Sequence, residues 1–517
     1  MPGIGFLEPN KRKRRGRRRA VANDTIEQKP FKQPLHRFPA VEFATVDEVE
    51  AIHSASLKLL EQTGIKVLWQ PAIDIMVEAG ASVTDDSMVT FAPELIMQFV
   101  GKAPAEFTMH ARNPLHSLKI GADAMSFCMM GSAPNSSCMD QGRRSGNTED
   151  FQNFLKLAQM HNILHMTGGY PVEPVDIHAS VRHLHCVADL ATLTDKAFSI
   201  YSLGTVRNQD AIEIVRLARG ISSEQLENEC SVWTVINTNS PLQLDIPMLQ
   251  GIYEMALSGQ LSIITPFTLA GAMAPVTVSG ALVLQNAEAL AGIAFSQMVK
   301  AGAPVMYGGF TSNVDMKSGS PAFGTPEYMR AQIVGGQLAR RYSIPYRTSN
   351  VCAANTVDAQ AAYESVFSLW GAVHSGMHLL KHGAGWMEGG LCCSYEKVIL
   401  DIDLLQMIDE FLSPLDVSDA ALGLDAIAEV GPGGHFFGTA HTQDRYKDAF
   451  YSPILSDWRN YESWHEAGRS EAMKKANTIW KNRLRQYEQP SMDPACSEAV
   501  QDFVARRVSE GGVATDF

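Results

Sequence analysis

Residues 230–241 read CSVWTVINTNSP, and residues 261–271 read LSIITPFTLAG. Each is a short run of apolar, largely β-branched residues that ends in polar or turn-forming residues. The residues between the two runs have the spacing of a helix. A strand, a helix and a second strand in this order predict two parallel strands joined by a crossover helix.

The same unit recurs over the middle of the chain. Helical patterns separate eight such runs, and eight parallel strands in roughly 280 residues match the count and size of a (β/α)8 TIM barrel. An open, doubly wound α/β sheet is the alternative, but the chain has no strand–GxGxxG–helix or GxxxxGK[ST] element to favour it. The runs are AMSFCMMGSAPN (124–135), ILHMTGGYPVEP (163–174), AFSIYSLGT (197–205), the two quoted above, PVMYGGFTSN (304–313), YRTSNVCAAN (346–355) and GAGWMEGGLCCS (383–394).

The segments on either side of these runs divide the chain into four parts. Residues 1–36 contain the run KRKRRGRRR and predict a basic, disordered arm. Residues 37–105 predict a helical N-terminal region, with a first helix that is capped at Thr45 or Asp47 and ends at Gly64. Residues 106–400 are the predicted barrel. Residues 401–517 predict a helical C-terminal region, with long helices near 463–487 and 494–510.

The charge of the chain argues against a nucleic-acid platform. Lys and Arg total 43 against 56 Asp and Glu, so the net charge is −13, although eight basic residues gather within residues 11–19. The body that remains is strongly acidic, and such a body binds nucleic acid poorly. The basic arm is either a solvated tail or a contact for an anionic partner.

Cysteine and hydropathy patterns predict a cytoplasmic protein with no metal of its own and no membrane span. The eight cysteines form no CxxC pair, and no His, Asp and Glu cluster has metal-ligand spacing. The N-terminus has no apolar core of a signal peptide. The longest uncharged stretch, Met255 to Ala287, is interrupted by Pro266 and Pro275.

In a TIM barrel the chemistry lies at the carboxyl ends of the strands. Here the residues at these positions are mainly aromatic, amide and hydroxyl, with one carboxylate, Glu388. No lysine is expected there, because Lys196 and Lys381 are predicted to precede their strands; this argues against Schiff-base chemistry. No GxSxG elbow is present. The strand-end candidates are Tyr201, Asn237, Asn239, Phe267, Tyr307, Phe310, Asn350, Cys352, Trp386 and Glu388.

Aromatic walls with one carboxylate suit a weakly hydrated organic cation, such as a quaternary ammonium ion. Each aromatic residue could instead belong to the barrel core. His435 and His441, in GPGGHFFGTAHT, could cap helices or close over the barrel mouth. Cys392 and Cys393 are adjacent, but a core position is favoured over a redox pair.

Several longer motifs resemble those of the trimethylamine:corrinoid methyltransferase family. They are GSAPNSSCMD, GSPAFGTPE, DAQAAYES, GWMEGGLCCSYEKVILD and, most specifically, GPGGHFFGTAHT followed by WRNYESWHEAG. The resemblance covers nearly the whole chain. Members that demethylate trimethylamine carry pyrrolysine in a slot that falls at Asn350 to Cys352 here, with Val351 the nearest match. Ordinary residues there imply the non-pyrrolysine branch, which takes quaternary amines such as glycine betaine.

The resemblance also implies a mechanism and partners. The methyl group would pass from a quaternary amine to cob(I)alamin, with no covalent enzyme intermediate and with Glu388 as the candidate residue at the cation. Asn237, Asn239 and His435 are expected to hold a carboxylate on the substrate. The cobalamin should arrive on a separate corrinoid protein, because the carrier motif DxHxxG is absent and Val181 ends the one partial match.

Other functions fit the same pocket. A non-catalytic betaine-binding or sensing barrel would use the same aromatic cage, and demethylation of another onium compound or of trimethylamine stays open. We also expect a homo-oligomer.

Overall fold

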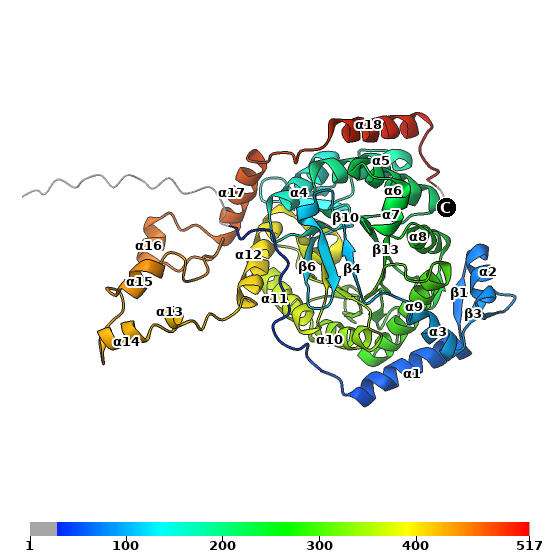
Figure 1. Cartoon of the computed structure of the whole chain (residues 1–517), viewed down its shortest axis with the longest axis horizontal. Coiled ribbons are helices and arrows are strands. Elements are labelled where there is room, and N and C mark those ends of the chain that lie inside the picture. Colours follow the sequence, from blue (N-terminus) through cyan, green and yellow to red (C-terminus); the bar gives the residue numbers. More distant parts are fainter. Residues whose placement is uncertain (1–27, 516–517) are drawn as a thin grey trace, which may run out of the picture.

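Eight parallel strands close into a barrel in the computed structural model, which describes residues 28–515 (Figure 1). The strands follow one another around the barrel in chain order, and the eighth pairs with the first. The predicted TIM barrel is therefore confirmed. The barrel strands are β6 (Ser126–Met129), β9 (Met166–Thr167), β10 (Ala197–Ile200), β11 (Val232–Ile236), β13 (Leu261–Ile264), β15 (Val305–Gly308), β18 (Tyr346–Ser349) and β19 (Leu379–Ala384).

Helices between the strands form the outer layer. Polar N-cap residues fix where most of them begin; Asp245, Thr277 and Asp358, for example, each accept a hydrogen bond from a backbone N–H of the first turn. The helices are α4 (Thr148–Met160), α5 (Ala179–Leu193), α6 (Thr205–Arg219), α7 (Ser223–Asn228), α8 (Ile246–Leu257), α9 (Val278–Val299), α10 (Pro326–Arg341), α11 (Ala359–His374) and α12 (Tyr395–Phe411).

Helix α9 is long and apolar enough to cross a membrane, yet it is a core helix of this fold. In its most apolar window, 78% of the residues are buried inside the protein. It packs against α8 and α10 of the barrel and against the N-terminal helices. Its apolar surface on nearly all sides is explained by these neighbours.

The eighth strand differs from the sequence prediction. It begins at Leu379, four residues before the predicted run, and Lys381 lies within it rather than before it. The prediction that Lys381 precedes its strand is therefore wrong, because a charged residue within the strand hid where the strand begins. The later part of the run forms β20 (Trp386–Met387), the 3-10 turn η2 (Glu388–Gly390) and β21 (Cys392–Ser394).

A hairpin closes the amino-terminal end of the barrel, which we call the base. Strands β4 (Glu106–Met109) and β5 (Leu118–Gly121) place Met109, Leu118 and Ile120 in one apolar cluster with side chains of the barrel interior. The 3-10 turn η1 (Pro114–His116) joins the two strands.

Residues 28–36, which the sequence assigns to the disordered arm, are packed along the base. Gln33 Nε2 donates to Ser126 Oγ at 2.8 Å, and Lys29 pairs with Asp409 at 3.0 Å. The rest of the predicted basic arm, residues 1–27, lies outside the described residues.

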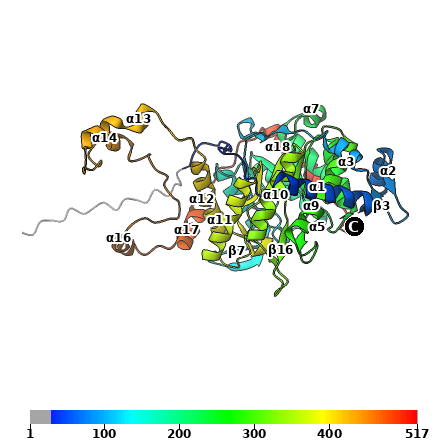
Figure 2. The same cartoon turned by 90° about the horizontal axis from the view of Figure 1, so that it is seen from below.

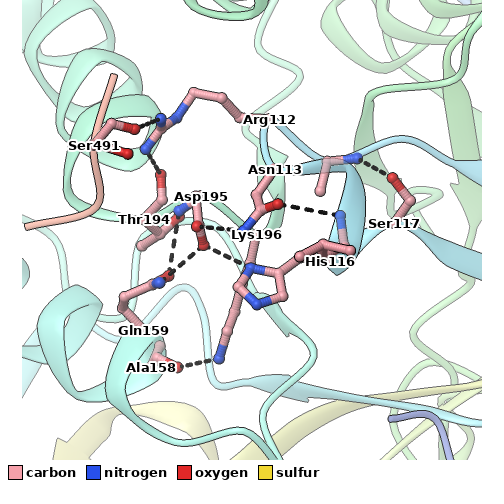
Figure 3. Close-up of polar contacts among 12 residues, drawn as sticks. Arg112, Asn113, His116, Ser117, Ala158, Gln159, Thr194, Asp195, Lys196 and Ser491 are labelled. Atoms are coloured by element: carbon pink, nitrogen blue, oxygen red, sulfur yellow. Dashed lines mark hydrogen bonds and ion pairs between the residues drawn. The ribbon is translucent and has the colours of Figure 1, made fainter. Parts of the chain in front are cut away.

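Two charged residues at the base are fully partnered (Figure 3). Lys196, which precedes β10, donates to the carbonyl oxygens of Ala158, His161 and Leu164 at 2.7–2.9 Å. Asp195 accepts hydrogen bonds from a histidine and two amides. Although burial opposes the effect, these bonds hold the pKa of Asp195 well below its usual range. The donors to Asp195 are His116 (2.7 Å), Asn113 (3.0 Å) and Gln159 (2.8 Å).

The N-terminal region contains a small sheet as well as helices. One of its strands pairs in parallel with β12 (Gln243–Leu244) from a barrel loop, and its first helix packs against α9. These contacts fasten the region to the side of the barrel (Figure 1). Its elements are α1 (Val46–Gln62), β1 (Ile65–Val67), α2 (Gln70–Glu78), β2 (Ser82–Val83), β3 (Met88–Thr90) and α3 (Pro93–Val100).

The C-terminal region leaves the barrel as a projecting arm and then returns. Figures 1 and 2 both show this arm extending away from the barrel. Helices α17 (Ala472–Arg485) and α18 (Pro494–Ser509) pack back on α12 and on α5 and α6, respectively. The helix predicted near 463–487 is interrupted at Gly468 and Arg469, where φ is positive. The arm helices are α13 (Asp419–Leu422), α14 (Leu424–Val430), α15 (Ala440–Arg445) and α16 (Tyr461–Glu466).

Short strands frame the carboxyl-terminal end of the barrel, which we call the mouth. They belong to the loops that follow the barrel strands, and they pair in two small sheets with the orders β20-β21-β7-β8 and β14-β16-β17. Figure 2 shows β7 and β16 at the same edge of the barrel. The strands not yet named are β7 (Asn135–Cys138), β8 (Gly142–Ser145), β14 (Leu269–Ala270), β16 (Ser312–Val314) and β17 (Pro321–Ala322).

Candidate active site

An aromatic cluster lies at the mouth, centred on Phe310 in the loop after β15. Its ring centroid is 5.2 Å from that of Phe267 and 5.9 Å from that of Trp386, both predicted from the sequence. Phe323 and His382 lie 5.8 Å and 6.0 Å away and were not predicted. Three predicted aromatic residues are therefore brought together with two that the strand-end positions did not reveal.

His382 packs closely against Trp386 in this cluster, with ring centroids 4.1 Å apart and ring planes tilted by 53°. It occupies an irregular position of β19 with φ of +58°, and its Nδ1 lies 3.1 Å from Ser349 Oγ. Burial and the nearby cations Lys381 and Arg347 lower the pKa of His382 well below its usual value. The imidazole is therefore neutral and adds an aromatic face rather than a charge.

Tyr201 forms a second aromatic pair at the mouth. Its ring lies 4.1 Å from that of Tyr170, which follows the adjacent strand β9, and its Oη donates to the Tyr170 carbonyl at 3.5 Å. Burial raises the pKa of Tyr201, so the phenol stays neutral. Tyr170 is buried and Tyr201 is half-buried, so the pair offers π surface without charge.

Tyr307 points away from the mouth, into the layer between the barrel and the helices. Its Oη lies 3.3 Å from Gln285 Nε2 and donates to Asn286 Oδ1 at 3.1 Å, both on α9. Residues at alternate positions of a strand point to opposite faces, and Met306 takes the interior position. Tyr307 is thus a packing residue.

The loop after β18 holds Asn350, Val351 and Cys352, and all three are buried. Asn350 Nδ2 donates to the Gly383 carbonyl at 3.2 Å, while its Oδ1 has no partner in the described chain. Ser368 Oγ donates to the Val351 carbonyl at 3.1 Å. Burial raises the pKa of the Cys352 thiol to about 12, so it is protonated and a weak nucleophile.

Glu388 already has an ionic partner. Its carboxylate accepts a hydrogen bond from Arg143 Nε of β8 at 2.8 Å. Its φ is +54°, a strained value for a glutamate, and its N–H donates to the Ala354 carbonyl. Much of its charge is therefore compensated within the protein.

The three residues predicted to hold a substrate carboxylate are dispersed. Asn237 is exposed at the end of β11. Asn239 is engaged with Asp245, to which its Nδ2 donates at 3.1 Å. His435 lies in the projecting arm beside Phe437, with ring centroids 6.0 Å apart. The structure brings neither Asn239 nor His435 to the aromatic cluster.

Two cations inside the barrel were missed by sequence reasoning. Arg347 of β18 is 2% exposed, and Lys381 of β19 is 5% exposed. The guanidinium carbon of Arg347 lies 5.3 Å from the Phe310 ring centroid, and Lys381 Nζ lies 5.6 Å from that of Trp233 on the opposite wall. The signal available in the sequence is a basic residue within an apolar strand, at an interior position by alternation.

The arrangement can bind an organic cation but offers few groups for covalent or acid–base chemistry. Aromatic faces attract weakly hydrated cations. The nearby histidine is neutral and the nearby thiol is protonated. Cys392 and Cys393 are buried free thiols, and burial raises the pKa of both.

Comparison with known families gives one match over almost the whole chain. The model described as "Trimethylamine methyltransferase (MTTB)" matches residues 10–512. A curated relative, glycine betaine methyltransferase of Desulfitobacterium hafniense (strain Y51), is 35% identical over 92% of this chain and 98% of its own length.

More distant relatives also match this chain over most of its length. Trimethylamine methyltransferase MttB of Desulfitobacterium hafniense (strain DSM 10664 / DCB-2) is 27% identical over 90% of this chain and 94% of the relative. A crystal structure described as the hydroxylamine MtmB complex superposes with a TM-score of 0.52 at 10% identity. It covers 87% of this chain and 90% of that one, and it bears on the fold alone.

Proposed function

The chain belongs to the trimethylamine methyltransferase family, and on that premise we propose that it transfers a methyl group from a quaternary amine to the cob(I)alamin of a corrinoid protein. The proposed methyl donor is glycine betaine or a related betaine. The observation that carries the proposal is the likeness to glycine betaine methyltransferase along nearly the full length of both chains.

The residues at the mouth support a quaternary amine as the donor. A quaternary nitrogen has no lone pair and departs as a neutral amine, so its methyl transfer needs no proton from the protein. The Phe310 cluster can hold such a cation, and each ring face contributes roughly 0.5–2 kcal/mol. The neutral His382 and the protonated Cys352 fit this requirement, since neither competes for the methyl group.

The slot after β18 supports the same choice within the family. Asn350, Val351 and Cys352 are ordinary residues there, and side chains of helix α11 bind the backbone at Val351 and at Ala353, the residue that follows the slot. This fits the branch of the family that lacks pyrrolysine. The task of this chain is then to bind the cation, align one N–CH3 bond and exclude water.

An apolar rim supports docking of a separate carrier protein. Six of the eight loops that follow barrel strands each expose a large apolar side chain, and these loops share the mouth. Such a ring of apolar residues is typical of a protein-binding surface. The corrinoid of the carrier would supply a Co(I) nucleophile for the methyl carbon. The rim residues are Met139, Val175, Leu203, Val276, Met316 and Leu391.

A visible-absorbance assay tests the proposal. The protein is mixed with chemically reduced cob(I)alamin and, in turn, glycine betaine, proline betaine, carnitine, choline, trimethylamine or dimethylsulfoniopropionate. We expect methylcobalamin to form with a betaine and not with trimethylamine. No conversion with any compound, combined with tight calorimetric binding of one, would instead identify a non-catalytic betaine-binding barrel.

A further inference from the structure

The barrel interior contains two cations without an anionic partner. Over residues 28–515, neither Arg347 nor Lys381 forms an ion pair, and Lys381 Nζ forms no hydrogen bond. Arg347 Nη2 donates to Ser349 Oγ at 2.7 Å. Its Nε and Nη1 are buried and have no acceptor.

Two other buried cations in this chain, in contrast, have acceptors within the protein. Lys397 is fully buried but lies 2.5 Å from Asp401, and Lys196 has three carbonyl acceptors. Burying a charge is costly unless it is paired and hydrogen-bonded. Within residues 28–515, Arg347 and Lys381 depart from the pattern of Lys397 and Lys196, which marks the barrel interior as a binding site for an anionic group.

The two cations adjoin the aromatic cluster. Phe310 links Arg347 to the cluster, because its ring lies 5.3 Å from the Arg347 guanidinium carbon and 5.9 Å from the ring of Trp386. Lys381 lies close enough to His382 of the cluster for its charge to help lower the pKa of that ring. A ligand held here would therefore have its anionic group close to its cationic group. In glycine betaine, one methylene separates the carboxylate from the quaternary nitrogen.

We propose that Arg347 and Lys381 bind the carboxylate of a betaine and disfavour quaternary ammonium ions that lack a carboxylate. This inference rests on the proposed function and names the specificity-determining residues of the same site. In this proposal Arg347 and Lys381, and not Asn239 and His435, hold the carboxylate of the substrate.

Charge balance explains the discrimination. Choline equals glycine betaine with the carboxylate replaced by a hydroxymethyl group, and it would add a third positive charge next to two unpaired ones. Like charges at short range in a buried site repel strongly. A betaine instead brings its own anion, so specificity arises from repulsion of the wrong ligand as well as attraction of the right one.

Protonation of Lys381 supplies a further signature. Burial and the neighbouring Arg347 lower the pKa of Lys381 to about 7. The other titratable groups facing it are Cys128 of β6, whose pKa burial raises to about 12, and the neutral His382. A bound carboxylate favours the ammonium form, so binding takes up a proton above pH 7. Betaine affinity is then flat below pH 7 and falls as the pH rises above it.

Isothermal titration calorimetry with glycine betaine and choline tests the proposal. We expect the wild type to favour glycine betaine by about 100-fold. Arg347→Gln should weaken glycine betaine binding by at least about 30-fold and leave choline binding unchanged or tighter. Lys381→Met should weaken it by about 10-fold and abolish proton uptake at pH 8. Arg330→Gln, the same change on the exposed side of α10, is the matched control and should change neither ligand.

Unchanged glycine betaine to choline ratios in Arg347→Gln and Lys381→Met, with both variants folded by circular dichroism, would overturn the proposal. If Arg347→Gln fails to fold, equal wild-type affinity for the two ligands without proton uptake has the same consequence. Failure of the proposed function is separate: it would appear as absent methyl transfer from every compound, whatever the binding ratio.

Discussion

Lys196 and Lys381 are both buried in the same barrel, yet the protein supplies hydrogen-bond acceptors to the ammonium group of Lys196 and none to that of Lys381. At the base, Lys196 meets three backbone carbonyls. In the interior, Lys381 lies over Trp233 with no acceptor. A buried charge that is fully hydrogen-bonded is compatible with a stable fold, whereas an unpaired buried charge destabilises the fold unless it loses its proton or a ligand pairs with it. Under the proposed role of Lys381, the base is the structural end of the barrel and ligand binding belongs to the interior below the mouth, in keeping with TIM barrels in general.

The largest expected effect is at the base. Lys196→Met removes the donor from three buried carbonyls, so we expect the free energy of unfolding to fall by about 3 kcal/mol. Urea unfolding measures it. A loss below about 1 kcal/mol would mean that water or rearrangement satisfies these carbonyls, and the contrast with Lys381 would weaken.

Low pH should lower stability through the base of the barrel as well. Hydrogen bonds from His116, Asn113 and Gln159 lower the pKa of Asp195, so its stabilisation is complete above its unfolded-state pKa and is lost as the pH falls from about 5. We expect a contribution of about 2 kcal/mol. Asp195→Asn should flatten this acid dependence in thermal unfolding from pH 6 to pH 3; an unchanged slope would assign the acid sensitivity to other carboxylates.

The sequence predicted the barrel far better than its interior chemistry. Seven strand runs were located because buried parallel strands are continuously apolar, as in the run at 261–271. The eighth was placed late because Lys381 and His382 interrupt LLKHGA. The strand YRTS was located, but the inward position of Arg347 within it was not recognised. A charged residue in a buried strand thus hid the start of one strand and, in the other, its own position in the barrel.

Side-chain direction and long-range pairing could not be predicted either. Phe310 and Tyr307 are three residues apart, but one belongs to the aromatic cluster and the other contacts α9. The Glu388–Arg143 pair joins residues 245 positions apart, through a hairpin that the sequence did not indicate.

Substitution of Lys381 should change the free energy of unfolding in the opposite direction to substitution of Lys196. Lys381→Met replaces an unpaired buried amine with an apolar side chain, so we expect stability at pH 7 to be unchanged or to rise by about 1 kcal/mol. Because the folded-state pKa of Lys381 is lowered to about 7, the wild type gains stability relative to this variant as the pH rises from 7 to 9. Chemical unfolding at both pH values provides the measurement. A marked destabilisation would show that groups of the protein, and not a ligand, stabilise the ammonium group of Lys381.

The smallest expected effect is at Glu388. Its pairing with Arg143 leaves little free charge for a substrate cation, so Glu388→Gln should change kcat/KM for glycine betaine by less than about 5-fold. Steady-state kinetics with cob(I)alamin decide the matter. A loss of 100-fold or more in kcat/KM would indicate that Glu388 contacts the substrate directly.

The most direct test of the account compares initial rates of methyl transfer to cob(I)alamin from glycine betaine and from choline at pH 7. The two compounds share the quaternary nitrogen and differ in the carboxylate that Arg347 and Lys381 are proposed to bind. The account predicts methylcobalamin from glycine betaine and a rate at least about 100-fold lower from choline. Equal rates would contradict it, because two unpaired cations in the barrel could not then be part of the site.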